Sequence, residues 1–400
     1  MNRLNTKYRE IIKSRRNALW FSAITALLML LICYFADNLK YSIISGPSVG
    51  QRIGQFREIT RLSKDKPTDE FVFVNVAYDR MLVPVLDEFG FPQGNIDITD
   101  RDKLRLFLSQ LNDSHKYVLM DVLLSDRYKS DSDSALVKTL KATDRLSISR
   151  SSTGKLIDTT LSSKAGYTDY STDIYETNFV KYEFLNNGEA TMPYLAYQTL
   201  NPKSKIHKFG PIHWTNGHLY WNSLTLRFPI KLWNDHTVIE ECSGLQEKKI
   251  LNLGSDILEM GIDVPSLVKD KIVVIGDFTE DDIHDTYIGK IAGPVININA
   301  LEALRNNQLE IPWTLVVFLF SVYTVIGYMT IRQPISTNKV LTKLHLNNSV
   351  IRYILSFIGY SFLLTAIGGG IYLMCGIDIN IILPSLWFTL LRGYTNTFAK

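Results

Sequence analysis

The chain has 400 residues, a length at which two or three domains are usual. Its formal net charge of +3 hides an acidic body: residues 37–312 contain 31 of the 43 Lys and Arg but 38 of the 40 Asp and Glu, whereas the flanks contain 12 basic residues and only two acids. Since the block 37–312 is acidic and the 12 basic residues of the flanks are divided among segments beside apolar runs, the charge pattern argues against nucleic-acid binding.

The N-terminal part predicts a membrane anchor. Residues 1–17 are basic, and residues 18–36 contain the uncharged run "LWFSAITALLMLLICYFA", which is long enough to cross the membrane as a helix. The run exceeds the apolar core of a signal peptide, and "CYFADN" has no small-x-small cleavage pattern. We therefore expect an uncleaved transmembrane helix.

Residues 37–312 predict an extracytoplasmic α/β domain. After a polar segment that we expect to include a membrane-proximal helix, "FVFVNVA" at residues 71–77 is typical of a buried strand ending at Tyr78-Asp79. The next three expected elements are a helix, a second buried strand and a second helix, over residues 102–112, 117–124 and 133–142. This alternation favours an α/β fold with a mixed, largely parallel sheet.

The middle of this domain has a different pattern. Residues 146–152 are expected to form a third strand, and Asn216-Gly217 between the aromatic, alternating flanks of residues 212–221 is a strong hairpin signal. We therefore predict an antiparallel hairpin extension. Cys242 is the only cysteine outside the apolar segments, so no disulfide is expected within the domain.

The α/β pattern returns before the membrane. Residues 271–275, within "DKIVVIGDFTEDDIHDTYIG", predict a strand that leads into a loop rich in carboxylates. Residues 294–306 predict a helix that runs towards the next apolar segment. Because no Gly/Ser-rich or Pro-rich linker and no repeat divides it, we interpret the block as one domain whose two ends return to the membrane.

The C-terminal part predicts further membrane helices, at residues 313–331, 353–375 and 377–391. The last segment is short and contains Asn380 and Pro384. The competing interpretation is therefore that the chain crosses the membrane three times and that this segment is an interfacial or re-entrant helix. With four spans, the basic N-terminus, the loop 332–352 and the tail 392–400 lie on one side, which the positive-inside rule makes cytoplasmic. We expect a multi-pass protein of the bacterial inner membrane with a periplasmic or extracellular main domain.

Two further features concern partners. Gly368-Gly369-Gly370, inside the third apolar segment, favours either close helix approach, as in a tight bundle or a homodimer, or a local kink. The basic segments beside the inner leaflet set the topology and attract anionic membrane lipid. The spans contain no ionisable residue apart from the peripheral Asp378, which argues against a transporter.

Four acids are candidate ligand-binding residues: Asp79, Asp121, Asp277 and Asp285. Ligands of parallel α/β sheets bind beyond the carboxyl ends of the strands, so acids on neighbouring parallel strands share one edge, where a cationic or polyhydroxylated ligand fits. The alternative is that these acids cap helices or bond loop backbone. His284 is far in sequence from other His residues, and the acids lack EF-hand spacing, so no metal or cofactor is expected.

Several motifs occur in a familiar order. A strand ends at Asp79, Gly90-Phe91-Pro92 follows, Asp121 lies within a strand and Asp133 begins a helix. Near the end stand "KDKIVVIGD", Asp285-Thr286 and "GPVININAL", which leads into a span. In this order and in its membrane layout, the chain resembles the second type of the CHASE family of extracellular sensory domains. The resemblance covers the external domain and all the spans.

The resemblance implies a sensor that is followed by an output module. Three positions depart from the family pattern: Tyr78 replaces an Ile, Phe91 a Trp and Asn297 a His, whereas Asn299 matches. Because residues 392–400 alone follow the last predicted span, we expect this chain to be no enzyme itself and to signal to a separate cytoplasmic or membrane effector. The alternatives are a scaffold subunit of a membrane complex and an Asp-dependent envelope hydrolase.

Overall fold

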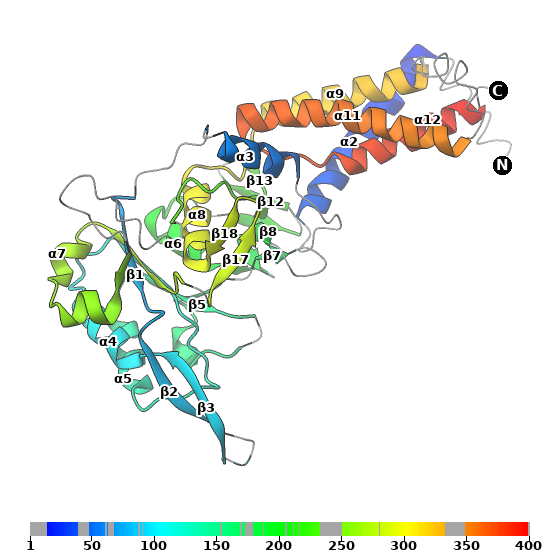
Figure 1. The fold of residues 1–400 in the computed structure, drawn as a ribbon. Coiled ribbons are helices and arrows are strands. Elements are labelled where there is room, and N and C mark those ends of the chain that lie inside the picture. Colours follow the sequence, from blue (N-terminus) through cyan, green and yellow to red (C-terminus); the bar gives the residue numbers. More distant parts are fainter. Residues whose placement is uncertain are drawn as a thin grey trace.

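The computed structural model describes residues 14–38, 48–60, 62, 68–86, 89, 91–152, 154–168, 170–172, 179–186, 188–204, 206–210, 212–215, 217–232, 250–279, 281–332 and 349–398. They form an α/β domain joined at one end to a bundle of long helices (Figure 1). The described residues leave out most of the two predicted basic segments, 1–17 and 332–352. They also leave out Asn216 and Cys242.

A six-stranded parallel sheet forms the centre of the domain, in the order β15-β1-β16-β4-β5-β6. Its strands are β15 (Ile250–Asn252), β1 (Phe71–Asn75), β16 (Ile272–Gly276), β4 (Tyr117–Asp121), β5 (Leu146–Arg150) and β6 (Ala165–Tyr167). The three strands β1, β16 and β4 are buried nearly throughout, as their apolar sequences predict for strands covered on both faces. The predicted α/β fold with a largely parallel sheet is confirmed.

Helices cover both faces of the sheet. Alternate residues of β16 enter two separate cores, Val273 and Ile275 on one face and Ile272 and Val274 on the other. The first face is covered by α4 (Arg101–Ser109), α5 (Asp133–Ala142), the π-helical turn η2 (Leu253–Glu259) and α7 (Val264–Val268). The second is covered by α6 (Met192–Leu200) and α8 (Gly293–Arg305), and α8 is buried along almost its whole length.

Antiparallel strands form several smaller, separate sheets around this one. The hairpin β2 (Arg80–Leu86) and β3 (Pro92–Thr99) reaches away from the helical bundle (Figure 1). A four-stranded meander confirms the predicted hairpin and contains β11 (His207–Phe209), β12 (Ile212–Thr215), β13 (His218–Tyr220) and β19 (Glu310–Ile311). Shorter pieces are η1 (Thr159–Leu161), β7 (Ser171–Thr172), β8 (Phe179–Glu183), β9 (Leu185–Asn186), β10 (Glu189–Ala190), β14 (Ser223–Leu224), β17 (Ile283–Thr286) and β18 (Gly289–Ala292).

Within the described part of the chain, three helices are long and apolar enough to cross a membrane: α2 (Arg15–Asp37), α9 (Trp313–Arg332) and α11 (Ser349–Cys375). A further helix, α12 (Ile382–Phe398), packs into the same bundle, where Phe388 contacts Tyr323 of α9 and Tyr360 of α11. It continues beyond residue 391, where the sequence predicted its end. The fourth span therefore stays a prediction, whereas the helix itself is present.

The domain is held against the outer ends of the bundle. The hydroxyl of Tyr34, near the end of α2, donates to the carbonyl of Tyr220 at 3.0 Å and accepts the N–H of His213 at 3.1 Å. The indole N–H of Trp313, at the start of α9, donates to the carbonyl of Gly217 at 3.3 Å. The meander thus fixes α2 and α9 to the domain. The predicted membrane-proximal helix is α3 (Val49–Ile59), which packs against α11.

The glycine run lies inside α11, which is one continuous helix from Ser349 to Cys375. Gly368 lies against Ile379 of the link before α12, and Gly369 lies against Ile53 of α3. These glycines therefore allow the link and α3 to approach α11 closely. Homodimer formation through this run stays a prediction.

Candidate functional site

Three polar side chains, Asn75, Asn252 and Asp121, meet at the carboxyl edge of the sheet. The strand register places Asn75 of β1 between Asn252 of β15 and Gly276 of β16, and places Gly276 beside Asp121 of β4. The strands that precede the predicted acids are therefore parallel neighbours, which is the condition for a shared site. A cavity of about 700 Å³ opens at this edge. It is bounded by the strand ends, the β2–β3 hairpin, the β17–β18 hairpin and the first turn of α8.

Acidic side chains dominate the charge of the cavity. Its carboxylates are Asp97, Asp121, Asp277, Asp281 and Asp282. Among the described residues that line it, Arg80 is the single Lys or Arg. Two of the four acids predicted from sequence, Asp121 and Asp277, are thus part of this site.

Asp121 is the last residue of β4 and bonds directly to α8. The side-chain amide of Asn297 donates to its carboxylate at 2.6 Å, and the Asn297 oxygen in turn accepts the hydroxyl of Tyr182 at 2.7 Å. Burial, and then the nearby charge of Asp282, raise the pKa of Asp121 to about 7, against hydrogen bonds that favour the ionised form. A carboxyl group that titrates near neutrality therefore stands between the central sheet and α8.

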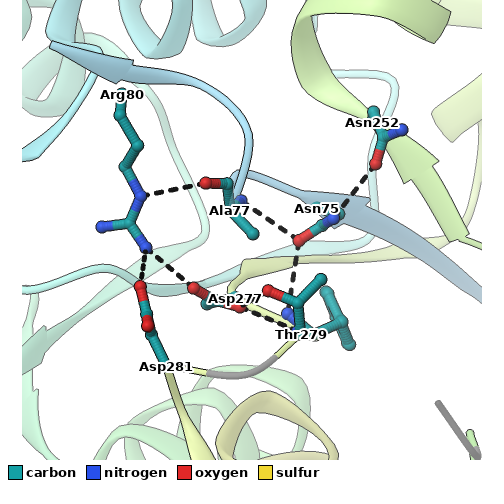
Figure 2. A network of polar contacts seen from close by, with 8 residues as sticks. Asn75, Ala77, Arg80, Asn252, Asp277, Thr279 and Asp281 are labelled. Atoms are coloured by element: carbon teal, nitrogen blue, oxygen red, sulfur yellow. Dashed lines mark hydrogen bonds and ion pairs between the residues drawn. The ribbon is translucent and has the colours of Figure 1, made fainter.

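Arg80 joins the hairpin to the loop that follows β16 (Figure 2). Its guanidinium donates to Asp277 at 2.8 Å and to Asp281 at 2.9 Å, and its Nε donates to the carbonyl of Ala77 at 3.0 Å. Asp277 also accepts the backbone N–H and the hydroxyl of Thr279, at 2.8 and 2.7 Å. Charge-assisted hydrogen bonds of this kind fix the loop relative to the hairpin.

Asn75 organises the strand ends beside this network (Figure 2). Its amide nitrogen donates to the side-chain oxygen of Asn252 at 3.0 Å. Its own oxygen accepts the N–H of Ala77 at 3.2 Å and that of Phe278 at 3.3 Å. One buried side chain therefore satisfies the backbone of two loops where they leave neighbouring strands.

A relay of three polar side chains lines the opposite wall. The hydroxyl of Tyr170 lies 2.5 Å from Nδ1 of His284, and Nε2 of His284 lies 2.9 Å from the carboxylate of Asp282. Because an ionised carboxylate only accepts, Nε2 carries the proton in this contact. The Asp282 carboxylate also lies against Gly293, the first residue of α8, whose helix dipole favours a negative charge there. Among the described residues, no group of three or more His, Cys, Asp or Glu side chains is placed to hold a metal ion.

The other two predicted acids lie outside this cavity. Asp79 is 4% exposed, and its carboxylate accepts Lys103 of α4 at 2.7 Å and the backbone N–H of Gly254, in η2, at 2.9 Å. Asp79 thus bonds backbone, which was the alternative to ligand binding in the sequence analysis of these acids. Asp285 is exposed on β17, opposite Lys290 of β18.

Sequence reasoning missed several residues of the site, among them Arg80, Tyr170 and Asn297. Arg80 follows Asp79 directly and begins a hairpin that the sequence did not reveal, Tyr170 lies in a section with no regular pattern, and Asn297 was noted only as a family departure. The signal for Asn297 was its place in the first turn of a helix expected to follow the acidic loop.

A parallel α/β sheet with a cavity at its carboxyl edge, joined to helices of membrane-spanning length, is the arrangement of a membrane-anchored sensory domain. The model of the CHASE2 domain family matches residues 76–330, from the end of β1 to α9, and the chain belongs to this family of extracellular sensory domains. The resemblance recognised in the sequence is thereby confirmed. No curated protein and no solved structure matches the chain.

Proposed function

We propose that this protein senses a small ligand in the cavity at the carboxyl edge of β1, β16 and β4, and signals through its membrane helices. One observation carries the proposal: two walls of the cavity, α8 and the β17–β18 hairpin, belong to elements that are connected to the bundle. A ligand that shifts either wall therefore shifts a membrane helix.

The ligand that fits this cavity is cationic or polyhydroxylated. Arg80 already pairs with Asp277 and Asp281, so the charge of Asp121 has no Lys or Arg partner among the described cavity residues. A bound ammonium group offsets the burial of Asp121, and hydroxyl groups donate to the same carboxylate oxygens.

The first connection runs through α8. Its first turn holds Asn297 against Asp121, and its last residue, Arg305, pairs with Glu70 through two hydrogen bonds of 2.9 Å. Strand β19 follows, and α9 begins at Trp313. A rigid, buried helix thus extends from the ligand cavity almost to the membrane.

The second connection runs through α3. Tyr287, in the turn of the β17–β18 hairpin, packs on Gly54, where an added Cβ would lie 2.6 Å from the ring. One helical turn earlier, Tyr372 of α11 packs on Gly50 in the same way, at 2.7 Å. The two tyrosines therefore clamp one face of α3 between the sensory hairpin and a membrane helix.

A binding assay tests the ligand. Thermal melting of the full-length chain in detergent with spermidine as a polyamine probe and with a hexose as a polyol probe should show stabilisation by one of the two classes. Asp121→Asn should abolish the effect, and Asp285→Asn should leave it unchanged. Failure of both probe classes to shift the melting temperature would contradict the assignment of the cavity.

Hydrogen exchange of the same samples tests the connection through α3. Ligand should change the protection of α3, and Tyr287→Ala should remove that change while ligand binding persists. Equal α3 responses in the two proteins would refute this route and leave the binding site intact.

We propose that the domain faces the periplasm of a bacterial inner membrane and that an effector reads the helices on the cytoplasmic side. The support is the clustering of flanking basic residues on one side of the predicted spans. Protease added to intact spheroplasts should remove residues 37–312 and spare both termini. Deletion of residues 339–346 should reduce recovery of the effector in a crosslinked pull-down; unchanged recovery would count against this surface.

A second candidate function is hydrolysis. The Tyr170–His284–Asp282 relay places a hydroxyl group beside a candidate general base, and the base beside an acid that orients it, as in hydrolases with an activated nucleophile. Incubation of the purified protein with envelope glycans or esters, followed by a measurement of product, discriminates between a hydrolase and a sensor. Product formation that His284→Ala abolishes would favour the hydrolase, and its absence together with binding favours the sensor.

A further inference from the structure

A second cavity, of about 430 Å³, lies where the domain meets the bundle. Its walls come from the end of α2, the start of α3, the strands β8 and β14, the face of α11 and the link before α12. It shares no lining residue with the cavity at the sheet edge. The junction cavity is therefore a separate site.

One end of the junction cavity is polar and carries an excess of negative charge. The carboxylate of Asp37 accepts the amide of Asn380 at 3.2 Å and lies 4.0 Å from the ammonium of Lys181. The carboxylate of Asp378 accepts the backbone N–H of Gly50 at 3.3 Å. Among the described residues that line this cavity, Lys181 is the single Lys or Arg against these two carboxylates.

Asp378 is the second carboxylate at this end. Its side chain is half-buried and accepts hydrogen bonds from Ser48 and Gly50. Among the described residues, no Lys or Arg forms an ion pair with it. A carboxylate that is partly removed from water in this way is stabilised by a bound ammonium group.

The other end of the cavity follows α11 and is mostly apolar, with the hydroxyl groups of Ser361 and Thr365 among its lining. Phe357, Ser361 and Thr365 are four residues apart, so they form one stripe that extends about 12 Å along the helix. The hydroxyl of Ser361 is buried and has no hydrogen-bond partner among the described residues. Ile381 and Ile382 face the same space. Because α11 is long and apolar enough to cross a membrane, this stripe lies at the depth of the acyl chains.

We infer that the junction cavity binds a membrane lipid with a primary ammonium headgroup. The ammonium donates to Asp37 and Asp378, Lys181 faces the phosphate, and one acyl chain lies along the stripe of α11. Such a lipid contacts α2, α3 and α11 at once, so its binding stabilises the arrangement in which the domain is seated on the bundle. This inference does not depend on the ligand of the other cavity.

Lipid retention by the full-length chain tests the inference. The protein is reconstituted in vesicles of phosphatidylcholine with equal additions of phosphatidylethanolamine or phosphatidylglycerol, extracted in detergent, and its retained lipid is measured by mass spectrometry. Phosphatidylethanolamine should be enriched over both others, because the quaternary choline group has no N–H to donate and phosphatidylglycerol has no cation. Equal retention of the three lipids would overturn the inference without any variant.

Two variants test the two ends of the site separately. Asp378→Asn should lower the enrichment of phosphatidylethanolamine about tenfold, the effect of losing one charge-assisted contact. Ser361→Trp should lower retention by filling the apolar end. Phe362→Trp, at a position 78% exposed on the same helix, is the matched control and should retain lipid normally. Circular dichroism verifies that each variant is folded, and unchanged enrichment in both folded variants would refute the site.

Discussion

Replacing Asp121 by Asn should stabilise the protein at neutral and alkaline pH, although the residue is buried at the centre of the site. The substitution keeps the shape of the side chain, and an amide oxygen still accepts the 2.6 Å hydrogen bond from Asn297. It removes the negative charge, which is unfavourable in this position because of burial and because of the nearby charge of Asp282.

The size of the effect follows from the pKa of Asp121. Its ordinary value of 3.8 applies to the unfolded chain, and its value in the fold is about 7. Between these pH values the unfolded state loses the proton while the folded state keeps it, so the free energy of unfolding falls as the pH rises through this window. One pKa unit corresponds to about 1.4 kcal/mol, which sets a ceiling of about 4 kcal/mol above pH 7. Water in the cavity and the coupling to Asp282 reduce this, and we expect about 1–4 kcal/mol.

Thermal melting of the full-length chain at pH 4 to 8 measures the difference. The two proteins should melt alike at about pH 4, and the variant should melt at progressively higher temperature above it, by roughly 2–4 °C for each kcal/mol. Asp285→Asn makes the same chemical change at an exposed position and should show no such trend. A variant that is destabilised at pH 8, or whose advantage does not grow with pH, would refute the reasoning.

Three further substitutions have expected outcomes. Arg80→Ala removes the ion pairs that hold the β2–β3 hairpin to the acidic loop, and should raise the exchange rate of hairpin amides about tenfold. Gly54→Ala places a methyl group 2.6 Å from the ring of Tyr287, and should lower the free energy of unfolding by about 1–3 kcal/mol. Burial alone would raise the pKa of Glu70, but hydrogen bonds from Arg305 and Lys116 lower it to about 2. Glu70→Gln should therefore lower the free energy of unfolding by about 1–2 kcal/mol above pH 4.5. This loss should shrink progressively as the pH falls towards 2.

Each of these substitutions has its own control. Arg127→Ala removes a guanidinium that forms no ion pair among the described residues and should leave hairpin exchange unchanged. Gly370→Ala adds a methyl group where nothing lies within 4 Å, so a loss of stability equal to that of Gly54→Ala would contradict the clamp on α3. For Glu70→Gln, a loss of stability that persists undiminished at pH 2 would show that packing, and not charge, is responsible.

The buried strands and the helices were predictable because their patterns are local. The apolar runs of β1, β16 and β4 and the helical spacing in α4 and α5 each lie within a dozen residues. The strands β15 and β6 were missed because three residues carry little periodicity, and β15 in addition pairs with a strand far away in the sequence. The β2–β3 hairpin was missed because Pro84, Gly90 and Pro92 indicate a loop, whereas ladder pairing overrides that signal.

The site was predictable only as an edge of the sheet. Asp121 was predicted inside a strand and Asp277 after one, and both line the cavity. Position at a strand end pointed equally to Asp79, which turns towards Lys103 and η2 instead. Which way a carboxylate faces depends on the helix that packs beside it, and no periodicity in the sequence encodes that. Tyr170 and Asn297 enter the site through tertiary packing alone.

The pairing of α2 with α9 has a consequence for how the sheet forms. The domain is an excursion between two helices that pack on each other, and β1 pairs with β16 across most of that excursion. Closing so long a loop is an entropic barrier that slows parallel strand pairing in free chains. Insertion of α2 and α9 into a bilayer before the domain folds would hold the ends of this excursion together and lower that barrier. The bilayer would then assist folding of the domain as well as anchor it.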